Sequence, residues 1–148
     1  MQMITEYLTK TYPRTFWATR VRLGSPHPEL LTPGISEEER RMIGVWRRWA
    51  DAVIVQKDKV IIMEAAIRPD PGDVSKLELY RRLLPVTDEY RQYKDRPVEC
   101  VLLYAIEDPA TILMAREQGI KCIEYKPDWL SSYMALLTAR ETRGVLHG

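Results

Sequence analysis

Long apolar runs separated by short polar segments dominate the chain from residue 45 to residue 125. Within each run the apolar residues are nearly continuous, which is typical of strands that are buried on both faces of a sheet. The polar segment QKDK lies between the first two runs and predicts a hairpin turn centred near Lys57 and Asp58. The predicted strands are residues 45–55, 60–67, 98–106 and 120–125.

Capping residues and helix breakers predict helices between and beside these strands. Ser36 opens a capping box, Asp73 is a suitable N-cap, and Asp108 precedes a proline in the first helical turn. Residues 87–96 are polar and predict a short helix or an excursion of the chain. The predicted helices are residues 36–44, 73–84, 109–119 and 127–140, with a short one near residues 4–8. Strands alternating with helices after an initial hairpin predict an α/β fold, with a mixed central sheet flanked by helices.

The composition fits one globular domain. The chain has 148 residues, of which 45% are hydrophobic and 29% are charged, so a disordered chain is excluded. Prolines and a glycine interrupt residues 26–34. We therefore divide the chain into an N-terminal arm (residues 1–35), an α/β domain (residues 36–142) and a frayed tail (residues 143–148).

The N-terminal arm is too apolar to be a flexible tail. Large aromatic side chains on an arm are typical of anchors at interfaces, and they can equally pack on their own domain. Both arrangements remain open, as does the corresponding choice between a monomer and an oligomer or larger protein assembly. The candidate interface residues are Tyr7, Tyr12, Phe16 and Trp17.

Charge and cysteine usage exclude few functions. The net charge of +1, from 22 basic and 21 acidic residues, gives no general case for a nucleic-acid partner, although a local basic patch stays open. Cys100 and Cys122 lie in apolar runs, so we expect buried thiols and no disulfide. The sequence shows no signal peptide and no membrane-spanning run. We expect no membrane partner and a cytoplasmic location, or the virion if the chain is a phage protein.

Two acidic residues occupy the apolar hairpin strands. Pairing about the turn places Asp51 opposite Glu64, within a residue or so. Facing carboxylates repel each other unless a cation lies between them, and hard oxygen ligands favour Mg²⁺ or Mn²⁺. The alternative is a set of structural salt bridges with Arg47, Arg48 or Arg68.

Lys76 falls within the apolar arc of the helix that follows the hairpin. A lysine in the first helical turn also opposes the helix dipole, so this position does not favour stability. The amine can reach over the end of the sheet toward the two acids. Alternatively, the side chain extends its amine to solvent.

The segment from residue 44 to residue 125 resembles the PD-(D/E)XK nuclease superfamily, whose fold is called restriction-endonuclease-like. Asp51 in WADAVIV resembles the first motif acid, and Glu64 in IIMEAAI resembles the acid of the (D/E)XK element. The segment GDVSKLELY resembles the following helix, where many members carry a glutamine-leucine-x-x-tyrosine pattern and this chain has Lys76 at the glutamine position. The resemblance implies a phosphodiesterase that uses a divalent metal, Mg²⁺ or Mn²⁺, on nucleic acid.

One position departs from the family pattern. The motif lysine stands two residues after the motif acid, and here that residue is Ala66. An alanine neither deprotonates water nor offsets charge in a transition state. Lys76 can supply the amine from the helix, as in members whose lysine has migrated, whereas Arg68 supplies charge but no proton acceptor. Without either substitute, the fold serves a purpose other than cleavage.

The resemblance implies a specific metal site. Asp51 and Glu64 would bind the metal together with the carbonyl of Ala65. An acid from an earlier helix often completes this site in the family, and the candidates here are the three consecutive residues Glu37, Glu38 and Glu39.

Three functions remain open on these observations. The first is a small metal-dependent nuclease in which Asp51, Glu64 and Lys76 are catalytic. The second is a non-catalytic assembly protein on the same fold, for example a phage head-tail or tail connector component. The third is a nucleic-acid-binding subunit without cleavage. In the first and third, the residues expected to contact phosphates are Arg47, Arg48, Arg68 and Arg81.

Overall fold

The computed structural model describes residues 2–24 and 49–147, with side chains described up to Glu141. Three sets of predictions lie outside the described residues. They are the helix at residues 36–44 with its three glutamates, the start of the first predicted strand, and the positions of Arg47 and Arg48.

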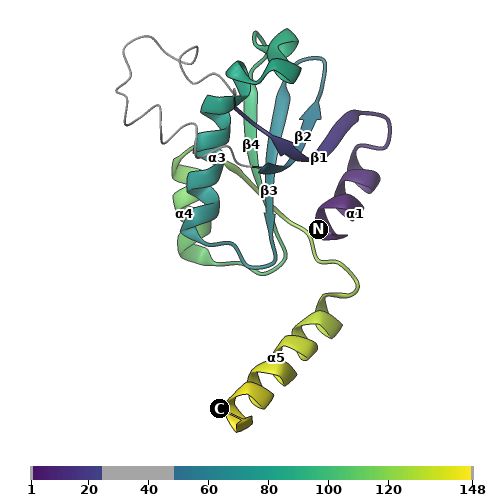
Figure 1. The fold of residues 1–148 in the computed structure, drawn as a ribbon, viewed down its shortest axis with the longest axis vertical. Helices are drawn as coiled ribbons and strands as arrows, with labels where there is room; N and C mark the ends of the chain where they lie inside the picture. The colour runs from purple at the N-terminus through teal and green to yellow at the C-terminus, as the bar shows by residue number, and fades with distance from the viewer. Residues whose placement is uncertain (1, 25–48, 148) are drawn as a thin grey trace.

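The described strands form one mixed sheet of five in the order β1-β2-β3-β4-β5 (Figure 1). The β1-β2 and β2-β3 pairs are antiparallel, and the β3-β4 and β4-β5 pairs are parallel. The predicted α/β fold with a mixed sheet and an initial hairpin is therefore confirmed. The strands are β1 (Phe16–Arg22), β2 (Trp49–Val55), β3 (Val60–Ala66), β4 (Val98–Tyr104) and β5 (Lys121–Glu124).

Helices cover both faces of this sheet (Figure 1). One face packs against α1 (Gln2–Thr11), and the other packs against α3 (Pro71–Leu83) and α4 (Pro109–Glu117). A short 3₁₀ helix, η2 (Leu84–Val86), follows α3, and a second one, η3 (Asp88–Tyr93), lies in the polar stretch of residues 87–96 that predicted a short helix or an excursion. The last helix, α5 (Leu130–His147), extends away from the sheet.

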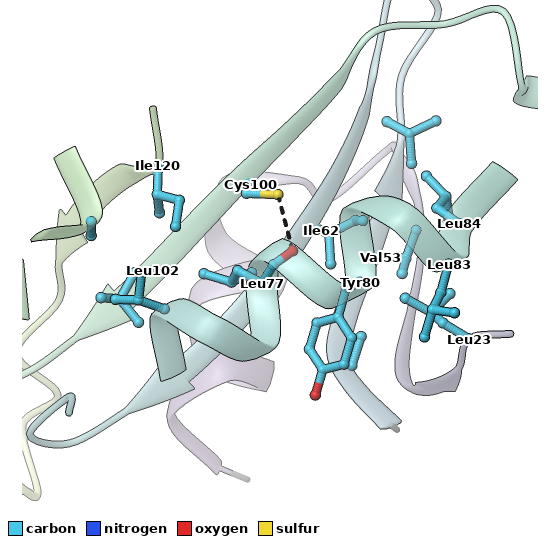
Figure 2. Packing of buried hydrophobic residues seen from close by; sticks show 14 of the residues in the cluster. Leu23, Val53, Ile62, Leu77, Tyr80, Leu83, Leu84, Cys100, Leu102 and Ile120 are labelled. Carbon is cyan, nitrogen blue, oxygen red and sulfur yellow. Dashed lines mark hydrogen bonds between the residues drawn. The ribbon is translucent and has the colours of Figure 1, made fainter. Parts of the chain in front are cut away.

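The core on the α3 face forms because α3 presents apolar residues at helical spacing to a continuous apolar sheet surface. Leu77 and Tyr80 pack with Ile62 and Leu102, and the Cys100 thiol donates to the carbonyl of Leu77 at 3.7 Å (Figure 2). We call this cluster the α3-side core. Its other members include Leu23, Val53, Val74, Leu83, Leu84 and Ile120.

The opposite face carries a second buried cluster, which we call the α1-side core. It joins residues of α1 to the alternate positions of β2, β3 and β4, and its members include Met3, Ile4, Leu8, Ala52, Ile54, Met63, Ala65 and Leu103. Alternation along β3 thus puts Met63 and Ala65 on the α1 face and Ile62 on the α3 face. Glu64 consequently faces α3.

Residues 2–24 belong to the folded domain, so the predicted division between an arm and a domain at residue 36 does not describe them. Strand β1 pairs with β2 along its length. The apolar pattern did not reveal β1 because this edge strand exposes polar side chains, among them Thr19, Arg20 and Arg22. An edge strand with charged residues is a common way to prevent unwanted strand pairing.

The aromatic residues proposed as interface anchors divide into two groups. Tyr7, Tyr12 and Trp17 pack against the α1-side core, so they contribute to this fold. Phe16 is different, because 63% of its surface is exposed.

The predicted frayed tail is also different in the structure, since α5 continues to His147. The segment before α5 is bound to α1 through Glu6. Its carboxylate accepts hydrogen bonds from Nε1 of Trp129 at 2.9 Å and from the hydroxyl of Tyr125 at 3.3 Å. Both cysteines are free thiols, as predicted. Among the described helices, none has the length and apolar character needed to cross a membrane.

Candidate active site

The hairpin register brings the two predicted acids to neighbouring positions. Ala52 and Met63 form the last pair of the β2-β3 register, and Asp51 and Glu64 are the residues that come next to this pair on the two strands. Oδ2 of Asp51 accepts a hydrogen bond of 2.8 Å from the backbone N–H of Ala65. Burial raises the pKa of the Asp51 carboxyl, and this hydrogen bond acts in the opposite direction.

Glu64 is buried, with 5% of its surface exposed. Its Oε2 atom is buried and has no hydrogen-bond partner among the described residues. Burial, followed by the negative charge of Asp51, raises the pKa of Glu64 from 4.5 to about 8. A carboxyl group in this position holds a proton at neutral pH unless a cation takes the place of that proton.

Lys76 places its amine beside Glu64, as the helical position predicted. Nζ of Lys76 lies 3.7 Å from Oε1 of Glu64 and 3.7 Å from Oδ1 of Asp73. The side chain is 37% exposed, so the amine lies where the buried acids meet solvent. The structure therefore brings Asp51, Glu64 and Lys76 together at one edge of the sheet.

Asp73 is a third acid of this site, and the sequence analysis assigned it a different place. The prediction of Asp73 as the N-cap is wrong, because the N-cap is Asp70 and Pro71 is the first helical residue. Oδ1 of Asp70 accepts from the N–H of Asp73 at 3.2 Å, and Oδ2 of Asp73 accepts from the N–H of Asp70 at 2.9 Å. This reciprocal pair is a capping box with an acid at the third helical position. The pattern Asp-Pro-Gly-Asp was the signal that could have placed Asp73 inside the first turn.

The donor set of this site suits a divalent cation that keeps other ligands. Among residues 2–24 and 49–147, no group of three or more His, Cys, Asp or Glu side chains is placed to hold one ion. Asp51 and Glu64 supply two carboxylates, and the unpartnered Oε2 of Glu64 is a buried oxygen that a cation would satisfy. Mg²⁺ commonly binds one or two carboxylates together with waters and substrate phosphates. The two acids therefore fit Mg²⁺ or Mn²⁺.

Comparison with known proteins identifies the architecture. No family model matches the sequence, and no curated protein matches it either. The structure is similar to the crystal structure of a repair endonuclease from Pyrococcus abyssi, with a TM-score of 0.52, 16% sequence identity, and coverage of 85% of this chain and 46% of that chain. The chain has the restriction-endonuclease-like fold. A second similar structure is an EndoMS-dsDNA2 complex, with a TM-score of 0.49, 14% identity, and coverage of 85% of this chain and 44% of that chain. This chain thus spans less than half the length of either structure.

Ala66, which stands where the sequence analysis expected the motif lysine, lies close to Glu64. Ala66 lies two residues after Glu64 in β3 and is half-buried. Strand alternation sets both on the α3 face. The amine of Lys76 approaches the same face from α3. The amine of Lys76 therefore lies in the region that the side chain of a lysine at position 66 would reach.

The arginines predicted to contact phosphates do not all join this site. Arg68 is exposed just beyond the end of β3. Arg81 lies further along α3, where it pairs with Glu78 at 3.6 Å and its charge acts on the thiol of Cys100. The cluster described by the structure thus consists of Asp51, Glu64, Asp73 and Lys76, with Arg68 nearby in the sequence.

Proposed function

We propose that this chain is a metal-dependent phosphodiesterase that acts on nucleic acid. The observation that supports this proposal best is the buried, unpartnered oxygen of Glu64 beside Asp51 and the Lys76 amine. Such an arrangement is unfavourable for an isolated domain, because a buried oxygen without a hydrogen-bond partner costs stability. A divalent cation and a phosphate group would satisfy it. The substrate class is inferred from the fold that the chain shares with a repair endonuclease.

Each residue of the site has a distinct role in this proposal. Asp51 and Glu64 bind the cation through their carboxylates, with the carbonyl of Ala65 as a further ligand. The Ala65 N–H holds Asp51 in place. When bound, the cation lowers the pKa of a coordinated water and neutralises charge on a phosphoryl oxygen.

Lys76 takes the role of the motif lysine, because the motif position holds Ala66. Its amine lies between Glu64 and Asp73, so it can hold the attacking water or stabilise negative charge on the phosphate. Asp73 is a positioning residue. It is fixed by the capping box and keeps the amine over the site.

A nuclease assay on purified protein tests this proposal. Labelled single-stranded DNA, duplex DNA and RNA are incubated with Mg²⁺, with Mn²⁺ or with EDTA. We expect cleavage with the metals only, and a loss of roughly 100-fold or more in Asp51→Asn and Glu64→Gln. These substitutions keep the side-chain shapes and remove the charges.

The matched control is the lysine–glutamate pair at the other end of the strands. Nζ of Lys59 lies 2.8 Å from Oε2 of Glu99, near the hairpin turn. Lys59→Ala and Glu99→Gln should cut as the wild type does. Cleavage that survives unchanged in Glu64→Gln would show that the activity has another origin.

A second candidate function follows from Ala66. If the helix lysine does not replace the strand lysine, the domain binds nucleic acid without cutting it. This alternative predicts salt-dependent affinity that EDTA does not alter and that neither Mg²⁺ nor Mn²⁺ converts into cleavage.

A further inference from the structure

Two turns meet beside the start of the edge strand β1. Phe16 pairs with Val55, so the turn between α1 and β1 lies next to the turn between β2 and β3. Together they border an open hollow of about 440 Å³, a size within the usual range of ligand sites. The lining residues are Arg14, Thr15, Phe16, Val55, Gln56, Lys57 and Asp58.

The aromatic wall of this hollow is open to solvent. Phe16 has 63% of its surface exposed, although it is the single phenylalanine of the chain. Directly paired strand residues share a face, and Val55 packs against the α3-side core. Phe16 therefore lies on the same face of the sheet as Glu64, at an edge that α3 does not cover because α3 packs on β3 and β4.

The charged residues of the hollow give it a positive balance. Arg14 and Lys57 are both exposed, and neither forms an ion pair with another residue of the described part. Asp58 contributes the opposing charge. An exposed aromatic ring with unpaired cations on either side is the arrangement by which proteins bind single-stranded nucleic acid, since bases stack on the ring and cations meet the phosphates.

The turn that carries Lys57 is held in place before any ligand arrives. The N–H of Gln56 donates to the carbonyl of Lys59 at 2.9 Å, and the carbonyl of Gln56 accepts from Nη1 of Arg96 at 2.7 Å. The guanidinium of Arg96 in turn lies 4.7 Å from the centre of the Tyr93 ring. A site that is ordered in advance loses less entropy when it binds.

We propose that this hollow is a subsite for single-stranded nucleic acid, in which one base stacks on Phe16 and the adjoining phosphates lie against Arg14 and Lys57. The inference rests on the proposed function for its substrate class. Val55 lies four residue steps from Asp51 along β2, which is roughly 13 Å at about 3.3 Å per residue. A strand of about four stacked nucleotides, at about 3.4 Å each, covers that distance. The same strand can therefore reach both the hollow and the acids.

Fluorescence anisotropy in EDTA measures this binding without cleavage. The probes are a labelled oligothymidine of about 12 nucleotides and the duplex that it forms with oligoadenine. We expect Phe16→Ala to weaken binding of the single strand roughly five- to hundredfold, and Phe16→Trp to bind at least as tightly as the wild type. Arg14→Gln and Lys57→Gln should each lower the salt slope by about 0.7. Asp58→Asn should tighten binding.

Leu113→Ala is the matched control, because Leu113 of α4 is 61% exposed and lies outside the hollow. Unchanged affinity in Phe16→Ala overturns the inference, as does an equal loss for single strand and duplex. A change of oligomeric state in Phe16→Ala, with unchanged affinity, would overturn it in favour of a protein interface. If the wild type cuts but Phe16→Ala binds normally, the inference fails and the proposed function stands. If Phe16 governs binding but no metal yields cleavage, the proposed function fails and the subsite stands.

Discussion

Arg20 of β1 and Asp51 of β2 are the residues that lie between two pairs of the sheet, Thr19 with Ala52 and Val21 with Ala50, and the backbone of Arg20 has a left-handed φ of 52°. The face of the sheet to which alternate side chains of β1 point changes at this residue. Trp17 packs against the α1-side core, whereas Val21, four residues later, packs against the α3-side core. A regular strand would place both on one face. The side-chain alternation reverses at this point in both strands, because Ala50 belongs to the α3-side core and Ala52 to the α1-side core, and the reversal in β2 falls at the candidate metal ligand Asp51.

The effect of a substitution at Arg20 on stability should depend on whether the new residue tolerates a left-handed backbone, and not on the size of its side chain. Left-handed backbone costs an L-residue about 1–2 kcal/mol, and glycine does not have this cost. We expect Arg20→Gly to stabilise the protein by up to about 1 kcal/mol and Arg20→Val to destabilise it by about 1 kcal/mol or more. Urea unfolding measures both values.

Arg22 provides the control for this prediction. Arg22 lies in the same exposed strand, and its φ is not positive, in contrast to that of Arg20. Arg22→Gly should destabilise by roughly 0.5–1 kcal/mol, and Arg22→Val should be nearly neutral. The same order of stability for glycine and valine at both positions would contradict the account given for Arg20.

Exchanging the lysine between helix and strand tests the role of Lys76. Lys76→Ala should lower cleavage roughly 100-fold or more, because the site loses its amine. Adding Ala66→Lys to that variant should restore part of the activity, since Ala66 lies on the face that Glu64 occupies. Initial rates on labelled DNA with Mn²⁺ measure both effects. Lys59→Ala serves as the control, and a double variant as inactive as Lys76→Ala would count against an exchangeable amine.

The stability of the metal-free protein should fall as pH rises from about 5 to about 8. The folded protein raises the pKa of Glu64 from 4.5 to about 8, so in this interval the folded state holds a proton that the unfolded state has released. The stabilisation from this proton is complete at pH values below the pKa of Glu64 in the unfolded state. It is lost as pH rises through the pKa of Glu64 in the folded state. We expect a decrease of roughly a few kcal/mol in urea unfolding with EDTA.

Glu64→Gln separates this effect from other titrations, because glutamine carries no ionisable group. The variant should show a flatter dependence over the same interval, and Glu99→Gln should resemble the wild type. If Glu64→Gln kept the full slope, Glu64 would not be the group responsible.

Metal binding should release a proton at neutral pH. Glu64 is protonated below pH about 8 in the metal-free protein, and a cation binds the ionised form. Calorimetric titration with Mn²⁺ at pH 7, in buffers with different ionisation enthalpies, should show release of up to about one proton per ion and affinity that increases with pH. Asp51→Asn should abolish binding. Proton release of zero in every buffer would argue that the cation binds elsewhere.

The sequence predicted the parts of the site that depend on strand register. The QKDK turn fixed the register of β2 with β3, because a hairpin of known centre has one register, and Asp51 and Glu64 lie next to its last pair, Ala52 and Met63. The position of Lys76 followed from the helical wheel, and the structure brings its amine to Glu64. The catalytic roles of these residues remain predictions.

The missed features are those without an apolar pattern. Strand β1 is polar and exposed, so only its pairing with β2 defines it. Asp73 was assigned to the helix end because an aspartate before an apolar run is a good cap, whereas Pro71 moves the start of α3 upstream. The left-handed backbone of Arg20 has no sequence signal, since arginine rarely adopts it.

The hydrogen bonds that Glu6 accepts from Tyr125 and Trp129 join positions 119 and 123 residues apart. Synthesis on the ribosome proceeds from the N-terminus, so α1 emerges long before these partners exist. Its final docking must wait until nearly the whole domain has been translated. Of the described helices, α1 is therefore translated before the others and is among the last to reach its finished environment, so chaperones would meet this domain with that helix still undocked.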